Sequence, residues 1–371
     1  MKKFIYIAIA LGVMIGLLSC NTTPVPASTT QPESTNTIIQ TDESTTPAPG
    51  AVTPNLLADN PNPPSSPVKL IFIHHSSGGN WLAAPESNGN GGDLGEALMN
   101  NNYYVSATNY GWGPDTIGDR TDIGHWWDWF RGTSSATYTA ALYTEYDQNI
   151  GGFGDWPRLT SDPGGENEII LFKSCYPNSN LGGSPTDAAT VGDNPMRGAW
   201  AGDSSYTVAN AKGIYNDILV FFASRQDKLF IVVTAPPLAQ ATTNATQAAN
   251  ARALNNWLVN DWLDGYPYNN VAVFDFYNVL TSNGGNPDTS DLGSATGNHH
   301  RWWNGAVQHL QTVSNNYSSY PMSSDDSHPN DQGNLKATAE FVQLLNVYYH
   351  RWADGSTPAP NMKIFMPVVK R

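Results

Sequence analysis

The chain has 371 residues, with 32 acidic and 18 basic side chains, so its formal net charge is −14. Recognition of a phosphate backbone requires clustered Lys and Arg, and this charge excludes nucleic acid as an expected partner. The two cysteines, Cys20 and Cys175, are too few for a cysteine-rich metal cluster. We expect neither a metal nor another cofactor.

The first twenty residues have the layout of an export signal. Lys2 and Lys3 precede an apolar run from Phe4 to Leu18, which is too short to span a bilayer comfortably. The end of this run, Leu-Leu-Ser-Cys, resembles a lipobox, in which the cysteine becomes the lipidated first residue of the mature protein. We therefore predict a signal peptide over residues 1–20, with lipidation of Cys20 and anchoring to the membrane. The alternatives are an ordinary cleaved secretion signal and an incidental cysteine.

Two segments have the composition of linkers. Residues 21–66 are dominated by Thr, Pro, Ser and Asn, which cannot bury enough apolar surface to offset chain entropy, so we predict a disordered tether. Residues 353–371 combine a Gly-Ser-Thr-Pro-Ala-Pro linker with an apolar and basic end. That end is interpreted either as a sorting or anchoring signal or as a strand that packs on the domain.

Between these segments, residues 67–352 are sufficient for one large domain with an extensive core. Short apolar runs rich in branched residues indicate buried strands. They are Val68–Ile73, Tyr103–Ala107, Glu168–Phe172, Leu229–Thr234 and Val271–Phe276. Helix-like stretches lie at Gly92–Asn101, Val208–Arg225, Ala248–Leu263 and Asn334–Trp352.

Strands that alternate with helices predict an α/β fold, in which right-handed crossovers make the sheet parallel and cover both of its faces. We therefore expect a three-layer α/β/α sandwich with a parallel, flavodoxin-like five-stranded sheet. Ligands of such sheets bind outside the carboxyl ends of the strands. The Gly- and Trp-rich insertions at Gly111–Glu166 and Thr281–Ser324 are candidate walls of a substrate site at that edge. Within the second insertion, Asn298–Trp303 either lines the site or packs as a loop.

The first predicted strand leads into His74-His75-Ser76-Ser77-Gly78-Gly79, a turn with little bulk that can present a hydroxyl. A serine becomes nucleophilic when a general base takes its proton, and backbone N–H groups at such a turn can stabilise an oxyanion. Ser76 is therefore the candidate nucleophile. Alone the signal is weak, because serines often cap the segment that follows them.

A second polar segment, Asp325-Asp326-Ser327-His328-Pro329, precedes the last predicted helix. Asp325 and His328 are three residues apart, a spacing that lets the carboxylate orient the imidazole while the other ring nitrogen faces a serine. The alternative is a solvated turn beside a surface histidine. In combination with Ser76, the segment predicts a Ser-His-Asp triad.

With both segments present, the sequence resembles the SGNH, or GDSL-like, superfamily of esterases and lipases. Members have a nucleophilic serine after the first strand and an Asp-x-x-His motif, commonly followed by proline, before the last helix. The resemblance covers residues 67–352 in strand order and implies Ser76 as nucleophile, His328 as base and Asp325 as its acidic partner. Two histidines stand where the family has Gly-Asp before the serine, which leaves Ser77 as the alternative nucleophile.

The same resemblance implies donors for an oxyanion hole. The family's second motif corresponds to Asn109–Thr116, where strict register places Pro114 at the donor glycine. Proline has no N–H, so Gly113 is the expected donor. In the third motif Cys175 stands at the position of the asparagine, and Asn178 is expected to supply the side-chain amide.

Together these features predict an exported, lipid-anchored serine esterase that hydrolyses carboxylic esters. Export and the aromatic-rich insertions favour O-acetyl groups of an extracellular polysaccharide as the substrate. The alternative is a catalytically reduced, glycan-binding surface protein on the same fold, because Pro114 and Cys175 stand where donors are expected. Two less favoured hypotheses are a nucleophilic Cys175 and a metal-dependent hydrolase that uses His74, His75, His299, His300 and His328.

Overall fold

The computed structural model describes residues 59–85, 90–286, 288–312 and 315–355. The predicted signal peptide with Cys20, residues 21–58 of the predicted tether and residues 356–371 of the tail lie outside this part of the chain. The predictions for those segments are therefore unchanged by the structure.

Five strands form an all-parallel sheet in the order β2-β1-β3-β4-β5. This is the flavodoxin-like order, and it confirms the predicted fold class. The strands are β1 (Val68–Ile73), β2 (Tyr103–Thr108), β3 (Ile169–Lys173), β4 (Leu229–Val233) and β5 (Val271–Phe274). All five are buried along their length, as expected for a parallel sheet that is covered on both faces.

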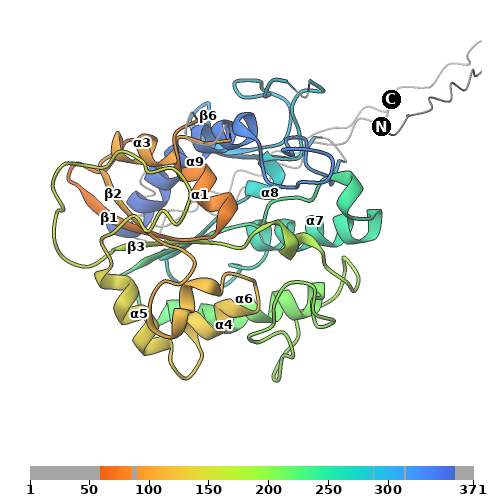
Figure 1. Cartoon of the computed structure of the whole chain (residues 1–371), viewed down its shortest axis with the longest axis horizontal. Helices are drawn as coiled ribbons and strands as arrows, with labels where there is room; N and C mark the ends of the chain where they lie inside the picture. Colours follow the sequence, from red (N-terminus) through yellow and green to blue (C-terminus); the bar gives the residue numbers. More distant parts are fainter. Residues whose placement is uncertain (1–58, 86–89, 287, 313–314, 356–371) are drawn as a thin grey trace, which may run out of the picture. The chain divides into compact units, whose positions relative to one another are not determined.

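Each strand divides its side chains between two cores. In β1, Leu70 and Phe72 pack on one face of the sheet, whereas Ile71 and Ile73 pack on the other. The first face is covered by α1 (Ser76–Leu82), α3 (Leu94–Met99), α8 (Phe276–Val279) and α9 (Asp331–Ala353). The second is covered by α4 (His125–Phe130), α5 (Ser135–Thr144), α6 (Val208–Ala223) and α7 (Ala245–Asn260). Figure 1 shows α4, α5 and α6 on one side of the sheet and α1, α3 and α9 on the opposite side.

The longest helices begin at side chains that satisfy their first backbone N–H groups. Thr207 accepts a hydrogen bond from the N–H of Asn210 at the start of α6, and Asn330 accepts one from the N–H of Gly333 at the start of α9. The start of α9 is therefore fixed locally by the sequence. This matters for the site because His328 lies just two residues before Asn330.

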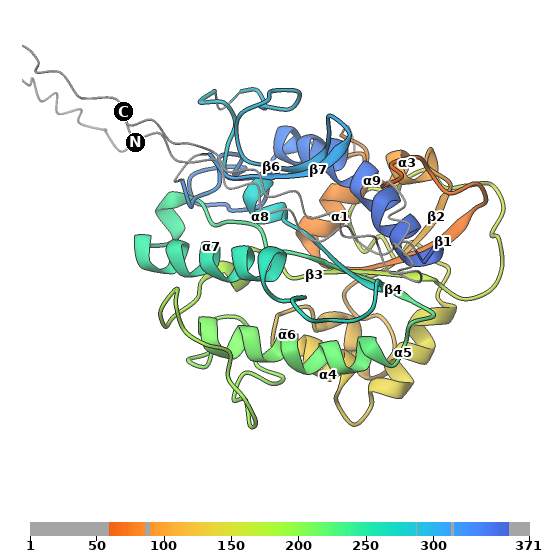
Figure 2. The same ribbon diagram turned by 180° about the vertical axis from the view of Figure 1, so that it is seen from behind.

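Several regions differ from the prediction. The last strand of the sheet ends at Phe274, not at Phe276, because the carboxylate of Asp275 accepts the N–H of Asn278 and starts α8. The second insertion contains an antiparallel hairpin, β6 (His299–Trp303) with β7 (Ala306–Leu310), which the sequence did not predict. Figure 2 shows this hairpin beside α9.

The predicted tether ends earlier than its composition suggests. Arg351 forms a bidentate ion pair with Asp59, with both N–O distances at 2.7 Å. The side chains of Asn346 and Asn102 donate to the backbone oxygens of Pro61 and Pro64 at 2.8 and 2.7 Å. The prediction was wrong for residues 59–66, because hydrogen bonds to the domain hold a segment that has little apolar surface of its own.

Short 3-10 helices complete the connections that surround the carboxyl edge of the sheet. They are η1 (Pro114–Asp119), η2 (Tyr176–Ser179) and η3 (Gln240–Thr242). Among the helices in the described ranges, none combines the length and the apolar character needed to cross a bilayer.

Candidate active site

Two adjacent strands place the candidate nucleophile at the point where the sheet reverses its order. Ser76 follows β1 and is the first residue of α1, and Cys175 follows β3, the neighbour of β1. In open parallel sheets this switch point, outside the carboxyl ends of the strands, is where ligands bind. Gly78 lets α1 approach the turn, because a Cβ atom there would lie 2.4 Å from the Cβ of His74.

Ser76 and His328 lie 252 positions apart in the sequence and meet at this edge. The distance from Ser76 Oγ to His328 Nε2 is 2.8 Å, and that from His328 Nδ1 to Asp326 Oδ1 is 2.6 Å. The carboxylate can only accept, so Nδ1 carries the proton and Nε2 is left to accept the proton of Ser76. Ser76, His328 and Asp326 therefore have the hydrogen-bond order of a nucleophile, a base and an orienting acid.

The structure corrects the predicted acid. Asp325 is exposed, and its carboxylate accepts the hydroxyl of Ser323 at 2.6 Å instead of contacting His328. Asp326 instead accepts two hydrogen bonds from His328, one from the backbone N–H at 3.0 Å and one from Nδ1–H at 2.6 Å. This local turn, in which an Asp side chain accepts the N–H two residues ahead, selects the aspartate that reaches the ring.

The segment around His328 is held by backbone pairing on both sides of the histidine. Met322 donates its N–H to the carbonyl of His328 at 2.8 Å, and Asn330 donates to Tyr320 at 2.8 Å. Ser327 is buried, and its hydroxyl accepts the N–H of Ala239 at 2.9 Å. The imidazole is thus presented by a turn that is fastened to the chain after β4 and to the start of α9.

The charges at the site favour an imidazole that holds its proton more strongly than a free histidine does. Burial lowers the pKa of His328, but its interactions with Cys175 and with the carboxylate of Asp326 outweigh burial and raise the pKa above 6.5. Burial raises the pKa of Asp326, but the two hydrogen bonds from His328 outweigh it and lower the pKa below its usual value. The two groups therefore stabilise the charged pair that forms during proton transfer.

Cys175 is an additional polar group beside Ser76. Its Sγ atom lies 3.6 Å from Ser76 Oγ and 3.2 Å from Ser77 Oγ, and it is partly exposed, unlike the buried apolar cysteine that is common at strand ends. Burial raises the pKa of Cys175, but the interactions with His328 and with Lys173 outweigh it and lower the pKa to about 6. The thiol is therefore largely ionised at neutral pH.

Lys173 and Ser77 form the buried floor beneath this thiol. Lys173 Nζ donates to Ser77 Oγ at 2.5 Å, and burial lowers the pKa of Lys173 to about 8. Ser77 is fully buried, and its hydroxyl faces Lys173 and Cys175. The hydroxyl that His328 contacts belongs to Ser76, so the geometry favours Ser76 over Ser77 as the nucleophile.

The two histidines before Ser76 are held by neighbouring backbone and hydroxyl groups. His75 donates Nε2–H to the carbonyl of Gly118 at 2.6 Å, and its Nδ1 accepts the hydroxyl of Thr121 at 2.9 Å. His74 is buried and donates Nδ1–H to the carbonyl of His75 at 2.9 Å. Burial lowers the pKa of both rings, to about 3 for His74, so both are neutral at physiological pH.

Asn178, the predicted amide donor, does not face Ser76. Its Nδ2 donates to Asp122 Oδ1 at 2.6 Å and to the carbonyl of Cys175 at 3.2 Å, and its Oδ1 accepts the N–H of Ile123 at 2.8 Å. The side chain is buried. Because both amide hydrogens are already used, the prediction that Asn178 supplies the oxyanion hole was wrong.

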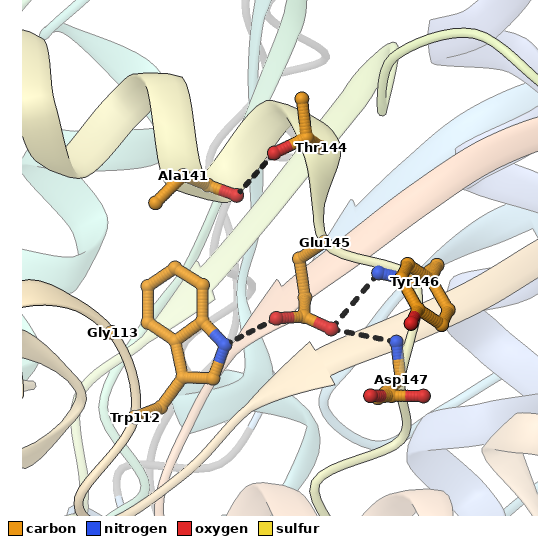
Figure 3. Close-up of a pocket in the computed structure, with 7 residues that line it drawn as sticks. All are labelled: Trp112, Gly113, Ala141, Thr144, Glu145, Tyr146 and Asp147. Atoms are coloured by element: carbon orange, nitrogen blue, oxygen red, sulfur yellow. Dashed lines mark hydrogen bonds between the residues drawn. The ribbon is translucent and has the colours of Figure 1, made fainter.

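Gly113, the other predicted donor, lines a different hollow. Figure 3 shows this pocket of about 470 Å³, in which Trp112 Nε1 donates to Glu145 Oε2 at 2.5 Å. Its lining also includes Tyr146 and Asp147, and none of the three triad residues. Gly113 therefore lines a hollow to which the triad does not contribute.

Tyr110 lies beside His75, and its role was not predicted from the sequence. The ring stacks on His75, the residue before Ser76, with 3.8 Å between the ring centroids, which places it beside the turn that carries Ser76. Burial raises the pKa of Tyr110, so the phenol keeps its proton at neutral pH. Its position two residues after β2 was the available signal.

The predicted insertions have mixed roles. Trp126 and Trp129 of the first insertion are buried in the core around α4 and do not form a wall. In the second insertion, His299 forms a hydrogen bond with Glu340 of α9 at 2.6 Å, and His300 accepts the N–H of Asp275 at 2.9 Å. This segment therefore packs against the domain and does not line the site. In the part of the chain that the structure describes, no three His, Cys, Asp or Glu side chains are arranged to hold a metal ion.

Comparisons with known proteins add no relative: no family model, no curated protein and no solved structure matches this chain. Function is therefore inferred from the geometry of the site.

Proposed function

We propose that the chain is a serine esterase of the SGNH type, which hydrolyses carboxylic esters through an acyl-enzyme. The observation that carries the proposal is the continuous hydrogen-bond chain from Ser76 Oγ to His328 Nε2, at 2.8 Å, and from His328 Nδ1 to Asp326, at 2.6 Å. These are the distances that a nucleophile, its base and the orienting acid require.

The geometry supports the following reaction. His328 takes the proton of Ser76 as Oγ bonds to the ester carbonyl carbon, and the carbonyl electron pair moves to the oxygen. Collapse of this intermediate breaks the bond to the alcohol, which receives the proton from His328. Water then attacks the acyl-enzyme by the same route and releases the acid, while Asp326 stabilises the imidazolium in both halves.

O-acetyl groups on an extracellular carbohydrate are the substrate class that we propose, with the enzyme exported and anchored through Cys20. Support comes from the amino-terminal sequence and from exposed aromatic rings near the carboxyl edge. Tyr110 and Tyr146 are 56% and 57% exposed. Replacement of Cys20 by Ser is expected to abolish incorporation of a labelled fatty acid, and unchanged incorporation would contradict the anchor.

The decisive experiment is labelling with a fluorophosphonate, followed by identification of the modified peptide. We expect the label on Ser76. Ser76→Ala should lose both the label and hydrolysis of p-nitrophenyl acetate, whereas Cys175→Ala should retain both. Ser224→Ala, which changes an exposed serine at the end of α6, is the matched control. A Ser76→Ala variant with full activity would exclude this mechanism.

A glycan-binding protein with reduced catalysis is the second candidate, favoured by the absence of Gly113 and Asn178 from the position of the oxyanion. The hollow with Trp112 and Tyr146 would then be the binding surface (Figure 3). Binding of a polysaccharide without release of any acid, and without labelling of Ser76, would favour this candidate over the esterase.

A further inference from the structure

The proposed reaction requires hydrogen-bond donors at the developing oxyanion, and the two predicted donors are elsewhere. Cys175, which stands at the position of the family's asparagine, cannot replace them because a thiolate has no proton to donate. Its negative charge would instead repel a nearby oxyanion, and more strongly at a partly buried site than in water. A neutral side chain that donates is needed next to Ser76.

Tyr110 is held at this place by its neighbours on both sides. Its backbone N–H donates to Asn109 Oδ1 at 2.9 Å, and Asn109 Nδ2 donates to the carbonyls of Asn149 and Ile150, both at 3.0 Å. The ring lies at 23° to that of His75, which is itself fixed by two hydrogen bonds. The phenol is therefore positioned before any substrate arrives, which is what makes an oxyanion donor effective.

We propose that the hydroxyl of Tyr110, together with the backbone N–H of Ser76, forms the oxyanion hole of this enzyme. Because the ring stacks on His75, the residue before Ser76, the phenol lies beside the nucleophile, where its hydroxyl can donate to the carbonyl oxygen of a bound ester. The assignment rests on the proposed esterase function and names a catalytic residue for it.

In the reaction, the carbonyl oxygen gains the electron pair of the broken π bond when Ser76 Oγ bonds to the carbon. Tyr110 donates a hydrogen bond to this oxygen and keeps its proton, because the oxyanion returns the pair when the leaving group departs. A raised pKa supports this role, since the phenol stays protonated through the pH range in which His328 is neutral.

The test is Tyr110→Phe in the full-length protein, which keeps the ring that stacks on His75 and removes the hydroxyl alone. We expect kcat for p-nitrophenyl acetate to fall about 10²- to 10³-fold with little change in KM, as for loss of one oxyanion donor. Affinity for a trifluoromethyl ketone, which forms a tetrahedral adduct with Ser76, should fall by the same factor as kcat/KM. If the hydroxyl had only a structural role, the loss of inhibitor affinity would not match the loss of kcat/KM.

Tyr268→Phe is the control, because Tyr268 is also an exposed tyrosine, 39% accessible, and it contacts Tyr266 far along the chain from the triad. It should retain wild-type kcat. If Tyr110→Phe keeps wild-type kcat and inhibitor affinity while the wild type is active, the assignment of Tyr110 is wrong and the esterase proposal stands. If the wild type neither turns over esters nor labels at Ser76, both proposals fail.

Discussion

His328 Nδ1 lies 2.6 Å from Oδ1 of Asp326, two residues earlier in the same loop, whereas the neighbouring Asp325 is bonded to Ser323. Asp326→Asn should therefore lower kcat by about 10²- to 10⁴-fold, because an amide holds the ring less firmly and cannot stabilise the imidazolium. Initial rates with p-nitrophenyl acetate measure the effect.

Asp325→Asn is the matched control, with the same change of charge one residue away. Its kcat should stay within about twofold of wild type, since surface charges of this kind contribute little. A large loss in Asp325→Asn combined with a small loss in Asp326→Asn would mean that the turn rearranges when substrate binds.

The pH dependence follows from the shifted histidine. His328 must be neutral to accept the proton of Ser76, so kcat/KM should be low in acid and rise with pH through a pKa above 6.5. Cys175 and Asp326 both raise this pKa. Cys175→Ala should therefore move the rise to lower pH without the loss of kcat that Asp326→Asn brings, and a profile that does not move would contradict the coupling.

Trp81 links the helix that begins with Ser76 to α9. It is fully buried, its ring stacks on Phe276 with centroids 4.8 Å apart, and Nε1 donates to Thr338 at 2.9 Å. Trp81→Ala should lower the free energy of unfolding by about 3–5 kcal/mol, measured by urea denaturation. Trp200→Ala, at a tryptophan that is 56% exposed, should cost less than about 1 kcal/mol. Equal losses in both variants would contradict the packing role.

The fold was predictable because its signals are local and repeated. Runs of branched residues and amphipathic periodicity predict strands and helices locally, and the handedness of their connections then predicts a parallel sheet covered on both faces. The predicted end of the last strand was wrong because the carboxylate of Asp275, a single polar group, ends β5 and starts α8. The β6–β7 hairpin was not predicted because its residues are mixed in polarity and its first strand, β6, packs against α9.

The sequence predicted those site residues whose role depends on their position next to a strand or helix. Ser76 follows a strand and His328 precedes a helix, and both places can be recognised in sequence. The choice between Asp325 and Asp326 depends on a turn of four residues, in which spacing alone favours the wrong carboxylate. The place of Tyr110 depends on how the loop after β2 is tied to Asn149 and Ile150, a contact some 40 positions away.

Cys175 provides a test of the electrostatics that does not depend on the substrate. With a pKa of about 6, the thiol should be mostly ionised at pH 7, and its alkylation by iodoacetamide should rise through pH 6 and level off above neutrality. Because Sγ is 3.6 Å from Ser76 Oγ, the added group should block the nucleophile and abolish esterase activity. Mass spectrometry of the peptide and residual activity measure the two effects.

Two variants separate the causes of this reactivity. Lys173→Met removes the buried positive charge while keeping most of the side chain's volume, so the pKa of Cys175 should rise and alkylation at pH 7 should slow. Cys175→Ala should keep its activity in the presence of iodoacetamide, because Ser76, and not the thiol, is the proposed nucleophile. If alkylated wild type stayed active, the thiol would not face Ser76; if Cys175→Ala were inactive while Ser76→Ala retained turnover, the nucleophile would be the cysteine.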